Sequence, residues 1–568
     1  MDVKPINDCI SIAEQIHESD LGELRDMGFT LIVCNRPDNE VAEQPSFDAI
    51  EKAAQQVGIT AIHLPFSATH LTDDIVESFT ALINSDQKIL AYCRTGTRSC
   101  NLWAASSAKM GKAPDALIAQ ANQLGYDVSH SVKQYSREVV EVSGNNNNQS
   151  MAKPLYDIVV VGAGSGGIAV SASLLKRNKT LRIALIDPVE NHYYQPGWTM
   201  VGAGIFTAES TKRSCKDLIP KMVSWIKKSV VSFTPEDNML CLDDGQDIYY
   251  THLVVCPGLT LNWAGIEGLE ENLGKNGVTS NYRYDLAPYT WQLVQSLARG
   301  KAIFTQPSMP IKCAGAPQKA LYLSADHWYR ANTLSDIELH FYNAGGVLFG
   351  VDAYVPALQT YMEKYQANIH YNYQLFKIDG EQKKAYFKGI DEHGEEVVVV
   401  QDFDMIHVCP PQVAPDFIAN SPLADTTGWL DVDKNTLRHN RFNNIWGLGD
   451  VINTANAKTL AAVRKQAPVV AQNIHDVIQG KEPCYGYDGY GSCPLTVERG
   501  KIILAEFGYG GKILPTFPLW LLQGKNPTWL AWWLKKDFLP GFYWHGMLKG
   551  HEILAAPMAL STVKESQD

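Results

Sequence analysis

The chain has 568 residues, too many for one hydrophobic core, and is expected to form three or four globular units. Its net charge of −12 argues against nucleic acid as a partner. The 11 cysteines include no C-x-x-C pair, which argues against a disulfide framework or structural zinc site, and the N-terminus lacks the features of a secretory signal, so a reducing cytoplasm is expected.

The N-terminal part of the chain alternates predicted strands and helices. Apolar runs at 29–35 and 88–93 predict buried strands, and the pattern at 46–58 predicts an amphipathic helix ended by glycine. Residues 143–154 are rich in Asn, Gly and Ser and have no apolar periodicity, which is typical of a flexible linker. We therefore predict an α/β domain over 1–142, followed by a linker.

A cysteine and two arginines follow the second of these strands. Cys93 and Arg98 are spaced as C-x4-R, Arg94 follows the cysteine directly, and Gly96 allows the chain to curl tightly. The backbone N–H groups of such a curl, a helix N-terminus and two guanidinium groups all lower the pKa of a thiol. We therefore predict a reactive sulfur at Cys93, and interpret Cys100 as a packing residue or a thiol that resolves an oxidised Cys93.

Residues 33–40 and 92–99 together resemble the β-lactamase-hydrolase-like phosphatase family, over about residues 1–110. The resemblance implies a phosphatase-type fold linked to sulfur metabolism. Protein tyrosine phosphatases use a larger C-x5-R loop, whereas the shorter loop is similar to that of rhodaneses, which carry sulfane sulfur as a cysteine persulfide. Sulfur transfer by Cys93 is therefore the preferred interpretation.

Two alternatives for this domain stay open. A phosphatase needs a general acid for the leaving group, but the upstream loop has Ser67 where an acid is wanted, and the nearest carboxylates are those of Asp73 and Asp74. The domain is therefore either a sulfur carrier, a phosphatase or a non-catalytic relic.

The second part of the chain begins with a predicted β-strand, helix and β-strand. The pattern G-x-G-x-x-G lies between the first strand and the helix and is formed by Gly162, Gly164 and Gly167. Gly166 is an additional glycine within it. A Cβ there would block the tight turn and the approach of a diphosphate to the helix N-terminus. Asp187 ends the next strand, where an acid can bind ribose hydroxyls. A dinucleotide site is predicted.

A late strand ends in Gly449 and Asp450, before a helical stretch. This segment resembles the second FAD motif of the two-dinucleotide-domain flavoproteins, in which the aspartate binds the ribityl chain. The resemblance implies FAD as the cofactor, in a glutathione-reductase-like domain built from 155–284 and 397–480.

The inserted segment, 285–396, is expected to form a second Rossmann-like domain. Its turn contains Gly345, Gly346 and Gly350, which are wrongly spaced for a dinucleotide, and no acid follows the next strand. The nicotinamide site is therefore expected to be degenerate, and the electrons to come from a donor other than NAD(P)H.

Four segments, 191–204, 310–323, 489–495 and 503–507, resemble the eukaryotic-type sulfide:quinone oxidoreductases, over about residues 155–555. The resemblance implies two-electron oxidation of sulfide, or of a sulfide-derived persulfide, with electrons passing through FAD to a membrane quinone.

Cys313 is the predicted redox thiol beside the flavin. It follows a strand and precedes a turn of small residues, and Lys312 and Lys319 favour its thiolate form. In the family, a second cysteine that carries the persulfide is expected directly after the late Gly-Asp, where this chain has Val451. The usual two-thiol cycle is therefore not expected to run unaltered.

Cys409 and Cys256 end strands that are expected to reach the neighbourhood of the flavin. Either of them, or Cys93, is a candidate for the second redox thiol, although packing is the simpler interpretation of Cys409 and Cys256.

The last segment, 481–568, is rich in aromatic residues. Three tryptophans fall at i, i+3 and i+4 of one helical face: Trp529, Trp532 and Trp533. Lys535 and Lys536 are expected to extend towards water, and Pro540 to end the helix. This pattern predicts peripheral attachment to a membrane surface. A dimer interface or an ordinary aromatic core is the alternative.

Three hypotheses for function follow. The first is a sulfide:quinone oxidoreductase fused to a sulfur carrier, with sulfide or persulfide, quinone and a small thiol acceptor as partners. The second is a flavoprotein acting on another thiol or persulfide, which Val451 favours. The third is a persulfide-binding or persulfide-sensing module in which the flavin is mainly structural. Whether the chain forms a homo-oligomer stays open.

Overall fold

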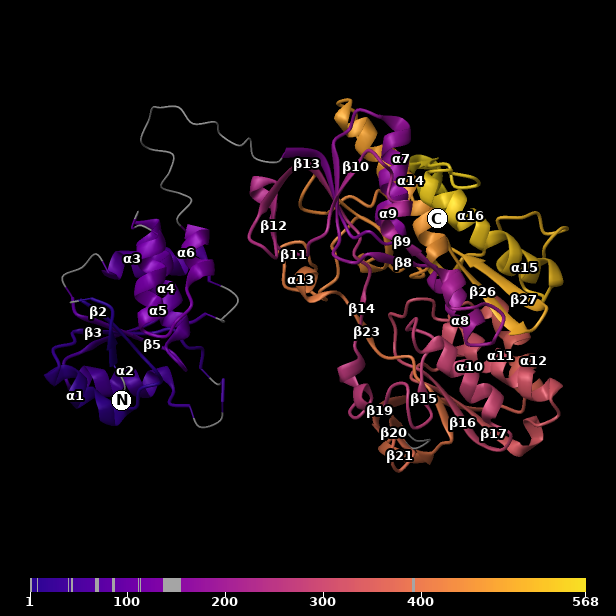
Figure 1. The fold of residues 1–568 in the computed structure, drawn as a ribbon, viewed down its shortest axis with the longest axis horizontal. Helices are drawn as coiled ribbons and strands as arrows, with labels where there is room; N and C mark the ends of the chain where they lie inside the picture. The colour runs from indigo at the N-terminus through magenta and orange to yellow at the C-terminus, as the bar shows by residue number, and fades with distance from the viewer. Residues whose placement is uncertain are drawn as a thin grey trace. The chain divides into compact units, whose positions relative to one another are not determined.

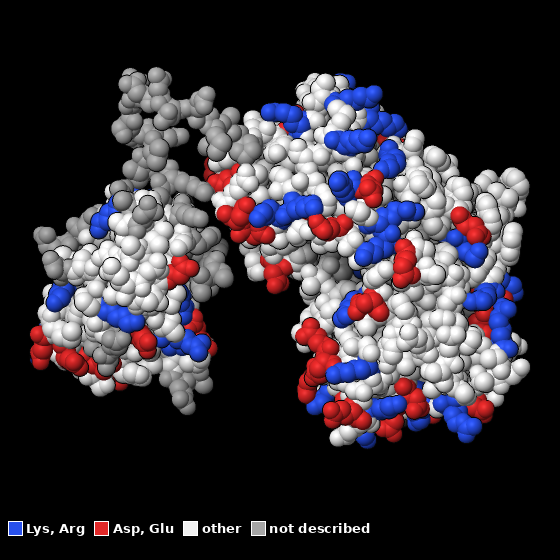
Figure 2. Space-filling view, in the orientation of Figure 1, with Lys and Arg blue, Asp and Glu red and all other residues white. Residues whose placement is uncertain are grey.

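The computed structural model describes residues 3–7, 9–38, 40–41, 44–66, 71–83, 87–110, 112, 114–135, 155–390 and 394–567. They belong to two compact units, Met1–Ser150 and Met151–Asp568 (Figure 1). The linker predicted over 143–154 lies outside the described residues. Figure 2 shows both basic and acidic side chains on each unit, with Lys and Arg gathered over the upper part of the larger one.

The first unit is built on a five-stranded sheet. In sheet order its strands are β1 (Val3–Pro5), β2 (Ile10–Ala13), β5 (Ile89–Tyr92), β3 (Leu31–Cys34) and β4 (Thr60–His63). All neighbouring pairs are parallel except β1 with β2. The strands predicted at 29–35 and 88–93 are confirmed as β3 and β5.

Helices cover both faces of this sheet (Figure 1). They are α1 (Leu21–Asp26), α2 (Phe47–Gln56), α3 (Asp73–Ile83), α4 (Thr97–Lys109), α5 (Pro114–Gln123) and α6 (Ser129–Tyr135). Successive side chains of β3 point to opposite faces. Leu31 and Val33 therefore pack in one core cluster, while Ile32 and Cys34 pack in the other. Burial on both faces explains why this strand is apolar throughout.

The second unit contains a seven-stranded sheet. Six strands follow the order β10 (Val223–Ile226), β7 (Ile183–Ile186), β6 (Leu155–Val161), β13 (Asp247–Val255), β12 (Met239–Leu242) and β11 (Val230–Thr234). β24 (Ile445–Gly447) pairs in parallel with β13. Because β24 joins this sheet, the late Gly-Asp segment belongs to the same sheet as the early glycine loop.

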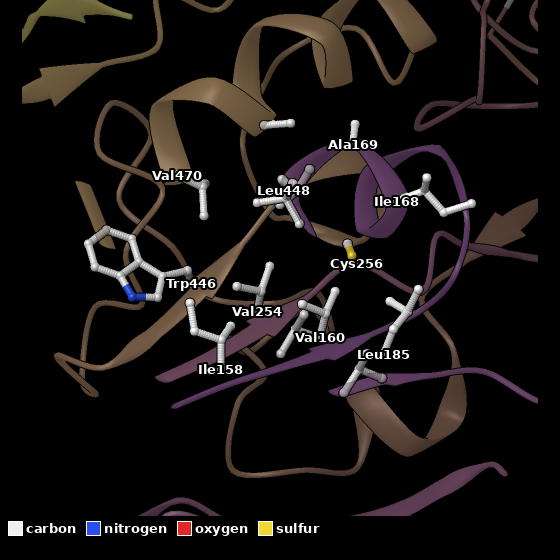
Figure 3. Close-up of a cluster of buried hydrophobic side chains, with 14 of the residues drawn as sticks. Ile158, Val160, Ile168, Ala169, Leu185, Val254, Cys256, Trp446, Leu448 and Val470 are labelled. Atoms are coloured by element: carbon white, nitrogen blue, oxygen red, sulfur yellow. The ribbon is translucent and has the colours of Figure 1, made fainter. Parts of the chain in front are cut away.

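Two helices pack against each other over this sheet, α7 (Ser165–Arg177) and α14 (Leu460–Ile478). Figure 3 shows Ile168 of α7 and Val160, Val254 and Leu448 of the sheet in one buried cluster. The first strand, helix and second strand predicted here are confirmed as β6, α7 and β7.

A second, parallel sheet follows the order β15 (Val278–Thr279), β22 (Met405–His407), β16 (Gly300–Gln306), β17 (Ile337–Asn343) and β18 (Asn368–Tyr371). β15 lies before residue 285 and β22 lies after residue 396. The sheet therefore extends beyond both limits of the domain expected from sequence. Its larger helices are α10 (Ala287–Ser296), α11 (Ala316–Arg330) and α12 (Val355–Lys364). A three-stranded sheet follows: β19 (Tyr373–Asp379), β20 (Lys384–Ile390) and β21 (Glu396–Asp402).

The C-terminal region is a hairpin followed by a helical segment (Figure 1, yellow). The hairpin strands are β26 (Gly491–Glu498) and β27 (Lys501–Phe507). The helical segment comprises α15 (Trp529–Trp533), a π-helical turn (Leu534–Phe538) and α16 (Leu539–His545). Pro540 was expected to end the helix, but it lies in α16, which follows the π-helical turn without a break.

Shorter elements complete the second unit: β8 (Asn191–Tyr193), β9 (Lys212–Ser214), α8 (Trp198–Val201), α9 (Cys215–Leu218), β14 (Thr260–Leu261), β23 (Gln412–Val413), α13 (Asp416–Ala419), β25 (Tyr485–Gly486), β28 (Met558–Ala559) and α17 (Leu560–Gln567). Across the described part of the chain, the helices fall short of the length and apolarity that a membrane-spanning helix requires.

Candidate active site

The glycine loop between β6 and α7 leaves an open cradle for a diphosphate. Gly162 has a φ of 103°, and a Cβ on it would lie 2.6 Å from the carbonyl oxygen of Cys256. A Cβ on Gly167 would overlap the carbonyl oxygen of Gly162, whereas one on Gly164 would meet nothing within 4 Å. Gly166 packs against Leu448. The open side at Gly164 faces the N-terminus of α7, which favours an anion.

Asp187 lies directly beyond the end of β7, next to this loop. One carboxylate oxygen accepts a hydrogen bond from the N–H of Ala163 (2.7 Å), and the other accepts one from Val189 (2.8 Å). The half-buried carboxylate is therefore fixed beside the glycine loop. Together with the open cradle, this arrangement fits the adenosine and diphosphate part of FAD.

The late Gly-Asp segment is held by buried polar groups. Gly449 has a φ of 82°, and its N–H donates to the side chain of Gln466 (2.9 Å). Burial raises the pKa of the Asp450 carboxyl, and the positive charges of Lys312 and Lys458 oppose that shift. The Lys458 ammonium donates to the carbonyl oxygen of Asp450 (2.7 Å). Burial also lowers the pKa of Lys458, to about 8.

The backbone connects Cys313 to this segment. Lys312 and Lys458 form a β-bridge, and the N–H of Cys313 donates to the carbonyl oxygen of Lys458 (2.9 Å). Cys313 has a φ of 56°, which is uncommon for a residue with a side chain. The structure thus brings Cys313 into contact with the segment that follows Asp450.

A second thiol lies against Cys313. The sulfur atoms of Cys313 and Cys493 are 3.5 Å apart, and Cys493 is buried on β26. A Cβ on Gly315 would lie 2.6 Å from the Cys493 sulfur, so a glycine is needed there to admit this side chain. Cys493 was not among the candidates for a second thiol named from the sequence, which were Cys409, Cys256 and Cys93. Val451 itself is fully buried in the hydrophobic core.

Cys256 and Cys409, two of the three candidates for the second thiol, have hydrogen-bond partners other than cysteine. The Cys256 thiol donates to the carbonyl oxygen of Gly162 (3.7 Å), and burial raises its pKa. The Cys409 sulfur accepts from the side chain of Gln412 (3.7 Å), and burial raises its pKa to about 12. Both thiols therefore stay protonated at neutral pH.

Lysine side chains set the charge of the thiol pair. The Lys319 ammonium lies 3.0 Å from the Cys313 sulfur and 3.7 Å from that of Cys493. The hydrogen bond from Cys493, followed by the Lys319 charge, holds the pKa of Cys313 well below its ordinary value, although burial acts in the opposite direction. The same hydrogen bond raises the pKa of Cys493. Of the two sulfurs, Cys313 is nearer to the Lys319 ammonium and is the one that carries negative charge more readily.

Two other lysines have hydrogen-bond partners that the sequence did not predict. Lys312 was expected to favour the thiolate; it interacts electrostatically with Cys313, and its ammonium donates to the side chain of Gln195 (2.7 Å). Lys535 was expected to reach water, but only 5% of it is exposed, and its ammonium donates to Thr496 Oγ1 (2.8 Å). Burial and the charge of Lys319 lower the pKa of Lys535 to about 7.

Several exposed tryptophans lie in α15 and in the loop before it. Trp529 is 65% and Trp533 41% exposed, whereas Trp532 is 8% exposed and packs in a core cluster. The prediction that all three share one exposed face is therefore wrong for Trp532. Trp520, in the preceding loop, is 84% exposed.

The side chain of Asn343 forms hydrogen bonds within the loop after β17. The N–H of Gly345 donates to Asn343 Oδ1 (2.9 Å), and Asn343 Nδ2 donates to the carbonyl oxygen of Val347 (2.9 Å). The degeneracy of this nucleotide site stays a prediction.

In the first unit, Cys93 is buried between β5 and α4, and Gly96 (φ 80°) caps α4. The guanidinium of Arg98 is also buried and donates to both oxygens of Glu40, at 2.7 and 2.8 Å. Burial lowers the pKa of Arg98, but the hydrogen bond with Glu40 and the electrostatic interactions with Cys93 and Glu40 more than offset this. The Arg98 guanidinium therefore interacts with both Cys93 and Glu40, while Arg94 is exposed.

Glu40 and Arg36 also belong to this hydrogen-bond network. Neither was predicted from the sequence as a site residue. Arg36 is buried and donates to Glu40 Oε2 (2.8 Å). The hydrogen bond from Arg98 lowers the pKa of Glu40 to about 2, so the carboxylate stays charged. Ser67 and the side chain of Asp73, considered above for a phosphatase acid, lie outside the described residues.

Metal ligands do not assemble in the part of the chain that the structure describes, where no group of three or more His, Cys, Asp or Glu side chains is placed to hold an ion. The site thus combines a cradle for FAD with a pair of cysteine sulfurs, one of which carries negative charge more readily. Fold and site together define a flavin-dependent oxidoreductase.

Comparison with known proteins agrees with this class. Residues 2–110 match the β-lactamase hydrolase-like protein, phosphatase-like domain, and residues 156–293 match the pyridine nucleotide-disulphide oxidoreductase family. The mitochondrial sulfide:quinone oxidoreductase of Dictyostelium discoideum is 41% identical over 72% of this chain and 89% of its own length. That of Mus musculus is 36% identical over 70% of this chain and 88% of its own length. The chain belongs to the sulfide:quinone oxidoreductase family.

A solved structure, the sulfide:quinone oxidoreductase of Aquifex aeolicus, shares the fold. It has a TM-score of 0.57 and 19% identity, and the match covers 70% of this chain and 92% of that one. Both resemblances inferred from sequence, for the first unit and for the second, are thereby confirmed.

Proposed function

We propose that this protein oxidises sulfide, or a persulfide derived from it, and transfers the electrons to a quinone. The proposal rests on the contact between the Cys313 and Cys493 sulfur atoms, 3.5 Å apart and beside Lys319. The relatives named above are sulfide:quinone oxidoreductases, and their name supplies the substrate and the acceptor. FAD, when bound, accepts the electron pair that the two thiols lose on forming a disulfide and passes it to the quinone.

The charges of the two thiols suggest which one receives sulfur. Sulfide attacks the Cys493 sulfur of the disulfide, the S–S bond breaks, and Cys313 leaves as a thiolate. Because a thiol of lower pKa leaves faster, Cys313 is the better leaving group, and the Lys319 ammonium 3.0 Å away stabilises its charge. Cys493 then carries the persulfide until an acceptor thiolate takes the outer sulfur. The released Cys493 forms the disulfide with Cys313 again.

The second hypothesis, a different thiol substrate, was motivated by the absence of a thiol at Val451. Cys493 removes that motive, because it supplies a partner sulfur without requiring a cysteine at that position. The third hypothesis, a sensing module with a structural flavin, gives no reason for a charged lysine 3.0 Å from one of two touching thiols.

Anaerobic titration with sulfide tests the proposal. Sulfide added together with a small acceptor thiol is expected to bleach the flavin of the wild-type protein and of Cys409→Ser, a matched control at another buried cysteine, and to leave the flavin of Cys313→Ser and Cys493→Ser oxidised. Bleaching of the Cys493→Ser variant at the wild-type rate would contradict the proposed role of the pair.

We further propose that Cys93 accepts sulfane sulfur from the persulfide. The Cys93 thiolate attacks the outer sulfur, a new S–S bond forms at Cys93, and Cys493 leaves as a thiolate. The observation that favours this is the position of buried Cys93 between β5 and α4, where it interacts electrostatically with the buried guanidinium of Arg98. Both thiols belong to one chain, so the transfer occurs at high effective concentration.

Product analysis of Cys93→Ser tests this transfer. With sulfide and a quinone but no added acceptor, the wild-type protein is expected to accumulate sulfane sulfur on Cys93. In the variant, turnover is expected to depend more strongly on an added small thiol. Unchanged kinetics and products, with and without the acceptor, would exclude the transfer.

We also propose peripheral attachment to a membrane surface, where quinones dissolve. The exposed Trp520, Trp529 and Trp533 support it, because aromatic side chains favour the membrane interface. The first unit is proposed to remain on the cytoplasmic side. Binding to vesicles, tested below, decides the question.

A further inference from the structure

The glycine loop is connected to the C-terminal region by a chain of hydrogen bonds. The hydroxyl groups of Ser165 and Tyr543 are 2.7 Å apart, and Tyr543 also bonds to His192 Nε2. The other ring nitrogen of His192, Nδ1, lies 3.2 Å from the carbonyl oxygen of Ala163. Tyr543, from α16, is thereby joined to two residues of the loop that is built to hold a diphosphate.

The direction of each hydrogen bond follows from the protonation of His192. Burial lowers the pKa of this histidine to about 4, so the ring is neutral at pH 7 and carries one hydrogen. A carbonyl oxygen only accepts, so the hydrogen is on Nδ1 and points to Ala163. The other nitrogen accepts from Tyr543, whose oxygen in turn accepts from Ser165.

This direction uses the only hydrogen of each hydroxyl group. Ser165 has none left for a diphosphate, although it lies in the first turn of α7. The backbone N–H groups at the start of α7 must therefore hold the diphosphate, and their orientation depends on the conformation of residues 163–165. Both ends of the hydrogen-bond chain lie within this segment.

Other contacts hold the same C-terminal region along α7. Glu552 accepts hydrogen bonds from Ser173 and from Arg177, with Arg177 Nη2 at 3.2 Å from Glu552 Oε2. A Cβ on Gly550 would lie 3.1 Å from the backbone of Ala172. The region is therefore fixed against α7 at both ends of this helix, with Tyr543 at the diphosphate end.

We propose that Tyr543 is a positioning residue for FAD. It lies in the C-terminal region, outside both segments of the FAD domain expected from sequence, yet its hydroxyl group fixes the conformation of the diphosphate loop. The inference rests on the FAD site of the proposed function but is independent of sulfide and quinone chemistry.

Tyr543→Phe tests the inference, because it removes only the hydroxyl group. The rate of FAD release from the diluted holoenzyme, followed by flavin fluorescence, is expected to rise about tenfold, as the loss of a buried hydrogen bond predicts. Tyr365→Phe is the matched control, because that buried hydroxyl donates to the carbonyl oxygen of Val497 (2.9 Å), in another part of the unit.

Two readouts separate positioning from general stability. Added FAD is expected to raise the melting temperature of Tyr543→Phe less than that of the wild type, while without added FAD this variant is expected to lose no more stability than Tyr365→Phe. Ser165→Ala, at the other end of the chain, is expected to release FAD faster as well. FAD release at the wild-type rate in both variants, or equally fast release in Tyr365→Phe, would overturn the inference. A failure of sulfide to bleach the flavin would affect only the proposed function.

Discussion

The Cys493 sulfur, on β26, and the Cys313 sulfur, on the loop before α11, lie 3.5 Å apart although 180 residues separate them in the sequence. The hydrogen bond between them gives the two sulfurs opposite pKa shifts, down for Cys313 and up for Cys493. This asymmetry assigns different tasks to the two thiols and leads to the first predictions.

Lys319→Met is expected to raise the pKa of Cys313, because the Lys319 charge is one of the causes that lower it. Cys313 becomes protonated when the pH falls through its pKa in the folded protein. In the variant, this protonation is therefore expected at a pH about one to two units higher. The measurement is the pH dependence of Cys313 alkylation. In Lys312→Met, the control, the profile is expected to shift less, since the Lys312 ammonium bonds to Gln195. An unmoved profile in Lys319→Met would contradict the assignment.

Lys535→Met is expected to raise the melting temperature at pH 7. The pKa of Lys535 in the folded state, about 7, lies below its ordinary value, so the folded protein binds fewer protons than the unfolded chain between these values. Stability therefore rises with pH across this range, and the gain from the variant is expected to shrink towards pH 10. Thermal unfolding at several pH values gives the answer, and a gain independent of pH would refute the explanation.

Glu40→Gln is expected to destabilise the first unit by about 1 to 3 kcal/mol, because it leaves two buried guanidinium groups poorly paired. The lowered pKa of Glu40 means that its contribution is full above the ordinary carboxyl pKa and is lost as the pH falls towards about 2. Alkylation of buried Cys34 and Cys100 in increasing urea reports unfolding of this unit. Lys52→Gln, which breaks the exposed pair with Asp48, serves as a control and is expected to change nothing.

The double variant Trp520→Ser, Trp529→Ser is expected to reduce binding to phospholipid vesicles at least tenfold, since it removes two of the largest exposed apolar side chains. Vesicle co-sedimentation measures the effect. Tyr329→Ser removes an aromatic side chain that is 52% exposed on α11 and is expected to bind as the wild type does. Equal binding by all three proteins would argue against the proposed membrane surface.

Local sequence patterns were sufficient for the strands and helices that form the dinucleotide fold. The glycines from Gly162 to Gly167 follow a strand and begin a helix, and the structure has β6 and α7 at these positions. Gly449 and Asp450 were assigned to the same domain by resemblance, and the pairing of β24 with β13 agrees with that.

The second thiol was not found from the sequence, because its contact with Cys313 is made by tertiary packing. Cys493 lies within a segment that carried the family resemblance, but Cys409, Cys256 and Cys93 were the residues considered as replacements for a cysteine at Val451. Gly315 was the available signal, since a small residue two positions after Cys313 leaves space for a neighbouring sulfur. The exposure of Lys535 was predicted wrongly for a similar reason. Helical spacing indicates the face on which the residue lies, but not that Thr496 accepts a hydrogen bond from its ammonium.

The claim that Cys313 and Cys493 form the redox centre is tested most directly by peptide mass spectrometry of the alkylated protein. Before sulfide is added, the account predicts that the two peptides are linked through sulfur. After anaerobic addition of sulfide to Cys93→Ser, which lacks the proposed internal acceptor, it predicts two separate peptides, with Cys493 carrying one additional sulfur atom. Free, alkylated Cys493 in the oxidised protein, or additional sulfur found only on Cys409 or Cys256, would contradict it.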